Sequence, residues 1–224
     1  MIPASKDPQP DVHRIVQTLR REVRDFEVPI VTEVSRKRRD PFEVLVGTIL
    51  SLRTKDEVTR GAAQRLLERA SDPAALLALD ESEIARLIYP VGFYKTKART
   101  LRQISRDLLE KYKGKVPDDL DELLKLKGVG RKTANLVITL GYGKEGVCVD
   151  THVHRISNRL GLVKTKTPEQ TEMALREKLP RKYWIEFNDL LVTWGQNICR
   201  PISPFCSKCA IRPYCRQVGV TRHR

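Results

Sequence analysis

The sequence predicts an all-α protein, because apolar residues recur at helical spacing and helix-start signals follow one another along the chain. Residues 11–26 carry the first apolar stripe. Pro at a first helical position marks further starts at Asp40-Pro41 and Asp72-Pro73. No segment shows the alternating pattern of a half-buried strand, so helices are expected to form the whole fold.

The elements expected after the first helix follow in chain order. Thr54 and Glu57 form the pattern of a capping box, which predicts a helix over residues 55–69 with Thr54 as its N-cap. Two glycines separate a helix over 117–126 from a helix over 131–140. The other segments expected to be helical are 82–88, 97–112 and 181–197, and Thr167-Pro168 marks one more start.

The charge balance predicts a polyanionic partner. Lys and Arg number 42 against 28 Asp and Glu, which gives a formal net charge of +14. No acidic residue follows Asp189, so the C-terminal segment is basic. Its basic residues are Arg200, Lys208, Arg212, Arg216, Arg222 and Arg224. The run Arg36-Lys37-Arg38-Arg39 is interpreted as a solvated loop face.

Nucleic acid is favoured over a membrane surface as this partner. No apolar run approaches the ~20 residues that span a bilayer. The N-terminus also lacks the apolar segment of a signal peptide. The chain is therefore expected to be intracellular, cytoplasmic and nucleoid-associated in a prokaryote, with no membrane partner.

A glycine hairpin, Gly128-Val129-Gly130, points most directly to chemistry. Glycines let another backbone approach closely, and the N-terminus of the helix that follows carries unpaired N–H groups that bind phosphate. Lys132 lies in the first turn of that helix, and Asp150 follows eighteen residues later at the start of another. Together these features suggest a reaction on a nucleic-acid backbone. The glycines alone fit an ordinary connection between two helices equally well.

Four cysteines near the C-terminus form a second cluster of candidate functional residues. Cys199, Cys206, Cys209 and Cys215 have the spacing C-x6-C-x2-C-x5-C. Such a set can surround one metal centre and hold a segment too short to have a core of its own. The spacing leaves structural zinc and an iron–sulfur cluster open, while disulfides fit an intracellular chain poorly. Cys148 lies in an apolar stretch and is expected to be buried.

The segment LKGVGRKTAN…VDTHVHR resembles the helix-hairpin-helix DNA glycosylase superfamily, and within it the endonuclease III family. The cysteine spacing is similar to that of the family's [4Fe-4S] loop at every interval. The resemblance covers residues 11–215, nearly the whole chain. It implies that the four cysteines bind a [4Fe-4S] cluster, and that the partner is double-stranded DNA containing damaged pyrimidines or abasic sites.

The resemblance also implies roles for individual residues. Lys132 matches the family's amine nucleophile, and Asp150 matches the carboxylate of its VDTH motif. Arg53 lies in a loop that fills the gap left by an extruded base, and Phe93 lies at the position of an intercalating wedge. The residues expected to contact DNA are Gly128, Val129, Gly130 and Arg131 of the hairpin, Ser51, Arg53 and Asp56 of the first loop, Phe93, and His152 near the phosphates.

Three positions depart from the usual family pattern. Lys127 stands in the hairpin where Pro is usual, Arg53 stands where Gln is frequent, and Phe93 stands where Leu is frequent. The fold does not depend on these side chains, but lesion and opposite-base preference do. Without the resemblance, Phe93 fits a core position equally well, and Arg53 fits a surface charge at a helix end.

The family's chemistry implies a bifunctional enzyme. Attack of the Lys132 amine on C1′ of an extruded nucleotide leaves a Schiff base, and β-elimination of the 3′ phosphate then nicks the strand. Asp150 is expected to orient or activate the amine and to stabilise positive charge on the sugar, and it also suits a simple N-cap. The expected activity is that of a base-excision-repair DNA glycosylase and abasic-site lyase, acting as a monomer on oxidised pyrimidines.

Two other functions fit parts of the sequence. A mismatch thymine or uracil glycosylase of the same superfamily would share the fold, but thymine-specific relatives typically have Tyr where Lys132 stands. A non-catalytic DNA-binding module explains the charge and the glycines, but not the pair formed by Lys132 and Asp150.

Two helical domains are expected. Residues 34–144 form a helical bundle that carries the hairpin. Residues 1–33 join residues 145–224 in a domain that holds the cluster. DNA is expected to lie in the cleft between the two domains.

Overall fold

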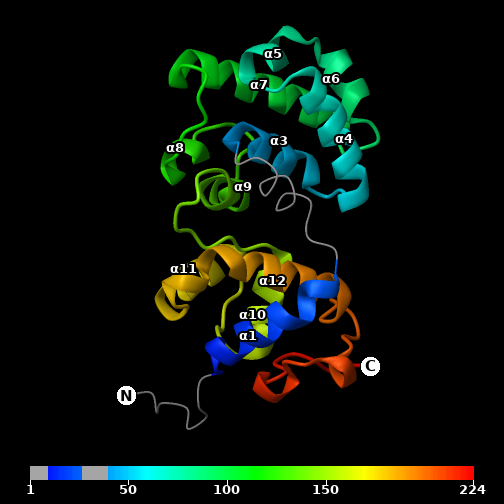
Figure 1. Ribbon diagram of the computed structural model, residues 1–224, viewed down its shortest axis with the longest axis vertical. Coiled ribbons are helices and arrows are strands. Elements are labelled where there is room, and N and C mark those ends of the chain that lie inside the picture. The colour runs from blue at the N-terminus through cyan, green and yellow to red at the C-terminus, as the bar shows by residue number, and fades with distance from the viewer. Residues whose placement is uncertain (1–9, 27–39) are drawn as a thin grey trace. The chain divides into compact units, whose positions relative to one another are not determined.

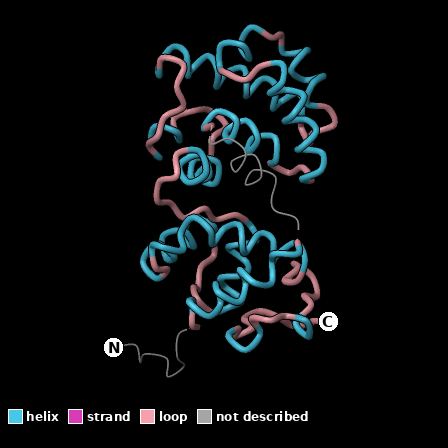
Figure 2. Tube along the Cα trace, viewed as in Figure 1, coloured by secondary structure: helices cyan, strands magenta, loops and turns pink. Residues whose placement is uncertain are grey.

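The computed structural model describes residues 10–26 and 40–224. Helices joined by turns and loops make up these residues, which contain no β-strand (Figure 2). The prediction of an all-α fold is therefore confirmed. The basic run Arg36-Lys37-Arg38-Arg39 lies outside the described residues.

The chain divides into two compact units, Met1–Glu27 with Val149–Arg224 and Val28–Cys148. Both units carry several helices (Figure 1). The division expected from the sequence, 34–144 against 1–33 with 145–224, stays a prediction about functional domains. None of the helices in residues 10–26 and 40–224 combines the length and the apolarity needed to cross a membrane.

The unit Val28–Cys148 is built around helix α3 (Pro41–Ser51), in which every residue from Val44 to Leu50 is buried. A helix that is apolar on all sides must be covered on all sides. Its neighbours are α4 (Asp56–Arg69), α7 (Tyr94–Tyr112), α9 (Arg131–Leu136) and the π-helical turn η2 (Val137–Gly141). The remaining helices are α5 (Pro73–Ala78) and α6 (Glu81–Ile88), which pack on α7, and α8 (Leu120–Leu124), which packs on α9.

Aspartate side chains cap three of these helices. Oδ1 of Asp40 accepts two amides in the first turn of α3, at 2.8 and 3.1 Å, and Asp72 and Asp119 cap α5 and α8 in a similar way. A carboxylate at the N-cap satisfies amides that have no partner within the helix. The predicted starts at Asp40 and Asp72 are confirmed. The helix expected over 117–126 is wrong in extent, because Asp119 is its cap and the helix begins at Leu120.

The predicted capping box at Thr54 is wrong. Helix α4 begins at Asp56 after Lys55, and no side chain caps its amides. The Thr54 hydroxyl instead accepts hydrogen bonds from the amide of Gly92 at 3.1 Å and from Nζ of Lys97 at 3.2 Å. The Thr54 hydroxyl oxygen therefore accepts tertiary hydrogen bonds, whereas the sequence pattern predicted that it would accept a helix amide.

The unit of Met1–Glu27 and Val149–Arg224 is built on α12 (Trp184–Asn197), which packs against α1 (Val12–Glu22) and α10 (Thr151–Leu160). Phe187 and Trp194 of α12 are fully buried. Gly195 permits the close approach of α10, since a Cβ at this position would collide with the His152 ring. The other elements are η1 (Val23–Asp25), α11 (Pro168–Lys178), η3 (Arg181–Tyr183), η4 (Cys206–Lys208) and η5 (Arg212–Tyr214).

Candidate functional site

The glycine hairpin forms an exposed turn between α8 and α9. Gly128 has a φ of +93°, and a Cβ there would lie 2.6 Å from Cγ2 of Thr100, so both conformation and packing require glycine. Val129 is only 6 % exposed and packs in the core, and its amide donates to the Leu126 carbonyl at 3.0 Å, so it anchors the turn. Gly130 is the N-cap of α9, and a Cβ added to it would have no neighbouring atom within 4 Å. The hairpin therefore presents main chain rather than side chains.

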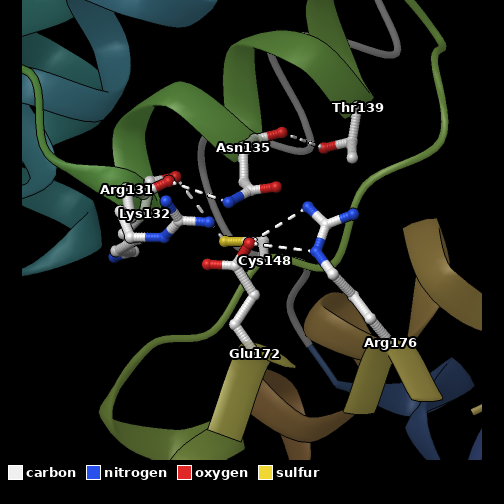
Figure 3. A network of polar contacts seen from close by, with 7 residues as sticks. All are labelled: Arg131, Lys132, Asn135, Thr139, Cys148, Glu172 and Arg176. Carbon is white, nitrogen blue, oxygen red and sulfur yellow. Dashed lines mark hydrogen bonds and ion pairs between the residues drawn. The ribbon is translucent and has the colours of Figure 1, made fainter. Parts of the chain in front are cut away.

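Lys132 lies in the first turn of α9, and its side chain is partly exposed. The thiol of Cys148 donates to the Lys132 carbonyl at 3.7 Å (Figure 3). One turn onward, the side-chain amide of Asn135 donates to the Arg131 carbonyl at 3.1 Å, and the Thr139 hydroxyl donates to the Asn135 carbonyl at 2.8 Å. These bonds hold the backbone beneath Lys132. The prediction that Cys148 is buried is confirmed.

Asp150 is the N-cap of α10. Its Oδ1 accepts the amides of His152 at 2.8 Å and Val153 at 2.9 Å, which confirms the N-cap interpretation. The two bonds fix the orientation of the carboxylate. Oδ2 takes no part in the cap, so capping does not use up the acceptor capacity of the group.

His152 occupies the first turn of α10, over Gly195. Nη2 of Arg155 lies 3.1 Å from Nδ1 of His152. Because a guanidinium can only donate, Nδ1 accepts, and the neutral ring then carries its proton on Nε2. Nη2 also donates to the Cys199 carbonyl at 2.8 Å, so one guanidinium joins His152 to the cysteine segment.

Arg53 and Phe93 lie side by side in two neighbouring turns of the unit Val28–Cys148. Cζ of Arg53 lies 5.8 Å from the centroid of the Phe93 ring, within the range of a cation–π contact. Both residues have left-handed backbone, with φ of 54° and 58°. Phe93 is 62 % exposed, so the interpretation of Phe93 as core packing is wrong.

Ser51 and Asp56 stand at the two ends of the turn that carries Arg53. The Ser51 hydroxyl donates to the Thr48 carbonyl at 2.8 Å. Asp56 is the first residue of α4. Both side chains are partly exposed, so each remains a candidate for contact with a ligand at this turn.

The four C-terminal cysteines line one pocket of the unit formed by Met1–Glu27 and Val149–Arg224. Cys199, Cys206, Cys209 and Cys215 are all free thiols. Burial raises the pKa of Cys209 to about 11 and also raises the pKa values of Cys206 and Cys215. Within the described residues, no three His, Cys, Asp or Glu side chains converge on the position of a single metal ion. Two polar residues, Arg159 and Gln217, also line the pocket, and the rest of the lining is apolar: Ile156, Leu160, Ile198, Pro204, Phe205, Ile211 and Val220.

Sequence reasoning missed Arg159, which holds the cysteine segment from α10. Its Nη1 lies 3.4 Å from Sγ of Cys199 and donates to the Arg200 carbonyl at 2.7 Å, and its Nη2 donates to the Pro201 carbonyl at 2.7 Å. Arg159 stands forty residues from Cys199, and nothing in the local pattern links the two.

Sequence reasoning also missed Lys97. Its side chain is only 7 % exposed, and burial lowers its pKa to about 8. Nζ donates to the carbonyls of Leu50 and Leu52, at 2.8 and 2.6 Å. The sequence did contain a signal. Leu101 and Leu108 follow Lys97 by four and eleven residues, so helical spacing places Lys97 on the apolar face of the helix expected over 97–112.

Comparison with known proteins identifies the family. A family model described as HhH-GPD superfamily base excision DNA repair protein matches residues 46–181, a span that includes the hairpin, Lys132 and Asp150. Endonuclease III of Thermotoga maritima is 49 % identical over 195 residues, which are 85 % of this chain and 92 % of that protein. The chain spans about half the length of a plant relative, a chloroplastic endonuclease III homologue of Arabidopsis thaliana, of which 48 % is matched.

Solved structures share the fold. A non-covalent complex of endonuclease III with DNA matches with a TM-score of 0.82 at 32 % identity, over 92 % of this chain and 94 % of the other. A trapped covalent intermediate of endonuclease III with DNA matches with a TM-score of 0.80 at the same identity, over 92 % and 95 % of the two chains. Because fold, sequence identity and family model agree, the chain belongs to the endonuclease III family of the HhH-GPD superfamily of base excision DNA repair proteins.

Proposed function

We propose that this chain is a base-excision-repair DNA glycosylase that is also an abasic-site lyase, and that it removes oxidised pyrimidines from duplex DNA as a monomer. One observation carries the proposal: Lys132 is a partly exposed residue in the first turn after an exposed glycine hairpin. The family membership of the chain supports this role, since a related endonuclease III has been trapped in a covalent intermediate with DNA.

Lys132 is the proposed nucleophile. Its neutral amine attacks C1′ of the damaged nucleotide, so the N–C1′ bond forms while the glycosidic bond breaks and its electron pair leaves with the base. Ring opening of the sugar gives a Schiff base. Loss of a proton from C2′ then expels the 3′ phosphate by β-elimination and nicks the strand. Hydrolysis of the Schiff base restores the lysine for another turnover.

Asp150 is the proposed carboxylate partner in this chemistry. Its charge stabilises the positive charge that develops on the sugar as the base departs, and it can accept a proton from the attacking amine. The cap supports both tasks, because two amide hydrogen bonds to Oδ1 hold the group in one orientation. A carboxylate held in place loses little freedom when the substrate binds.

Arg53 and Phe93 are proposed to open the duplex. A base inside a stacked helix must be extruded before its glycosidic bond can be reached. An exposed aromatic side chain that enters between base steps offsets part of the lost stacking. Phe93 has the required exposure, and Arg53 has donors that can bond to the base left without a partner. Ser51 and Asp56, at the two ends of the turn that carries Arg53, are also proposed to contact DNA.

The hairpin and the basic residues are proposed to bind phosphate. Main-chain amides at Gly128 and Gly130 suit a phosphate because the hairpin exposes backbone and leads into a helix N-terminus. The Val129 amide holds the turn instead, since it donates to the Leu126 carbonyl at 3.0 Å. Arg131 and His152 are proposed to contact neighbouring phosphates. The net charge of +14 predicts that affinity falls steeply as salt rises, because bound counterions are released.

The residues of the cysteine pocket fit a [4Fe-4S] cluster, and we propose that Cys199, Cys206, Cys209 and Cys215 bind it. The pocket brings together four free thiols among mostly apolar side chains. The cluster would supply a cross-link for a segment with little core of its own, and no step of the base-excision chemistry passes through it.

Borohydride reduction tests the proposal, because it converts a Schiff base into a stable adduct. The duplexes should contain an oxidised pyrimidine, an abasic site or a G·T mismatch. Adducts on the first two substrates, with little on the third, are expected. Adducts formed mainly on the mismatch would assign the chain to mismatch repair, and a chain that binds all three duplexes without any adduct would be a binding module. Sedimentation of the DNA complex checks the proposed monomer.

A further inference from the structure

Lys97 occupies an unusual place for a lysine, because it is buried among neutral hydrogen-bond acceptors. Its Nζ donates to the carbonyls of Leu50 at 2.8 Å and Leu52 at 2.6 Å, and to the Thr54 hydroxyl at 3.2 Å. An ammonium has three protons to donate, so these three bonds use its full capacity. A lysine is rarely buried without a reason of this kind.

The bonds from Lys97 to Leu50 and Leu52 lie at the C-terminal end of α3. The last carbonyls of a helix have no partner within the helix, and a cation is favoured at this end. Leu50 belongs to the last turn of α3, and Leu52 is its C-cap. Lys97 therefore fixes the point at which the chain leaves α3 and enters the turn of Arg53.

Lys97 also contacts the turn of Phe93, which precedes α7. The amide of Lys97 donates to the Phe93 carbonyl at 3.0 Å, so the main chain of Lys97 holds one turn while its side chain holds the other. Thr54 links the same two turns, since its hydroxyl also accepts the amide of Gly92 at 3.1 Å.

The two turns touch at backbone level. A Cβ added to Gly92 would lie 2.7 Å from the carbonyl oxygen of Arg53, so only glycine fits at this contact. Arg53 and Phe93 then meet through guanidinium and ring, 5.8 Å from Cζ to centroid, with left-handed backbone at both residues. Strained backbone of this kind persists only where surrounding contacts hold it.

We propose that Lys97 is a positioning residue that couples the turn of Arg53 to the turn of Phe93, so that both side chains meet DNA as one preset unit. The inference rests on the proposed function, because it takes these two turns as the ones that open the duplex. Preset side chains lose less freedom on binding than mobile ones, so the coupling favours discrimination of the opposite base.

Equilibrium binding tests this coupling without requiring chemistry. The substrates are duplexes with an uncleavable tetrahydrofuran abasic analogue opposite guanine or opposite adenine, at one salt concentration. Wild type should bind the duplex with guanine opposite the analogue about fivefold or more tightly than the duplex with adenine, because a well-placed arginine contact to guanine can provide this affinity ratio. Arg53→Gln and Lys97→Met should each reduce this ratio to near one. The double variant should lie within about twofold of either single variant, because coupled residues are not additive.

Two controls separate positioning from charge and from misfolding. Lys95→Met removes the same charge from an exposed position in the first turn of α7 and should keep the guanine preference. Thr54→Val breaks the link between the turns while leaving Lys97 in place, and should lower the ratio, whereas Thr54→Ser should retain it. The Thr54 pair carries the test by itself if Lys97→Met does not fold.

Several results would overturn the coupling. These are a wild-type ratio of one, an unchanged ratio in Lys97→Met, and losses from Arg53→Gln and Lys97→Met that multiply in the double variant. Borohydride trapping of wild type on a true abasic site is the separate arm for the proposed function. Absence of an adduct there would refute the lyase activity, while the affinity ratios would still decide the role of Lys97.

Discussion

Oδ1 of Asp150 accepts the amide of Val153 at 2.9 Å, and this hydrogen bond makes the proposed catalytic carboxylate also the N-cap of α10. The capping function needs only an acceptor oxygen, whereas the proposed chemistry needs a negative charge. Two substitutions at this one position can therefore separate structure from catalysis.

Asp150→Asn should lower the glycosylase rate by about a hundredfold or more, because it removes the charge that stabilises the sugar cation. Its melting temperature should stay near that of wild type, since an amide oxygen can still cap α10. Single-turnover kinetics and thermal unfolding measure the two effects. Asp150→Ala is the control and should also lose about 1 kcal/mol of stability, or about 2–4 °C. Full activity in Asp150→Asn would reduce Asp150 to a structural cap.

Lys132→Gln should still bind duplex DNA but give no adduct on borohydride reduction, because a glutamine side chain cannot form a Schiff base. Lys125→Gln is the matched control, since it removes one positive charge at the C-cap of α8, where Lys125 pairs with Glu122 at 2.5 Å. The control should form the adduct normally. Gel separation of adducts from free DNA, with binding measured in parallel, gives both results. Normal trapping by Lys132→Gln would place the nucleophile elsewhere.

Purified protein should be yellow-brown and contain about four iron atoms per chain, as expected for one [4Fe-4S] cluster. Cys209→Ser should lose this absorbance and weaken DNA binding, because the segment that carries Lys208 and Arg212 is no longer held. Cys148→Ala is the control and should keep its iron, since Cys148 lies in the other unit. Iron and zinc analysis decides the matter, and a colourless protein with one tightly bound zinc would be the contrary result.

Phe93→Ala should slow excision of an intact damaged base by about tenfold or more, from the loss of one stacking contact of about 1–3 kcal/mol. Cleavage of a preformed abasic site should change only a few fold, because no base has to be unstacked there. Phe93→Leu restores an apolar side chain and should recover most of the lost rate. Single-turnover rates on matched duplexes provide the comparison, and equal slowing on both substrates would show that Phe93 has no wedge function.

Gly92→Ala should destabilise the protein by about 1–3 kcal/mol, because the added Cβ would lie 2.7 Å from the Arg53 carbonyl oxygen. Gly47→Ala is the matched control within α3, where a Cβ would meet nothing within 4 Å. That control should gain about 0.5–1 kcal/mol, because alanine is the better helix former. Thermal or urea unfolding measures both variants. Equal stability of the two would mean that the backbone around Gly92 shifts to accept a Cβ at little cost in free energy.

The parts of the fold that were predictable depend on neighbours in the chain. Asp40 and Asp72 cap helices whose amides lie two or three residues away, so their roles are written in the local sequence. The apolar stripes predicted the buried faces for the same reason. The π-helical turn at Val137–Gly141 was not predicted, since it coincides with the approach of Gly141 to Pro41, where a Cβ would lie 2.9 Å from the Pro41 Cα atom.

The candidate site also has features that the sequence determined and features that only the tertiary structure decided. The hairpin glycines, Lys132, Asp150 and the four cysteines stand in compact motifs, so the sequence alone determined the family and the proposed chemistry. Only the tertiary structure decided which atoms hold Arg53 and Phe93 in place. The bond from Nζ of Lys97 to the Leu50 carbonyl joins residues 47 positions apart, and the same packing took the Thr54 hydroxyl from its expected cap. Capping and periodicity act over a few residues, whereas a buried ammonium finds its acceptors only after distant helices have packed.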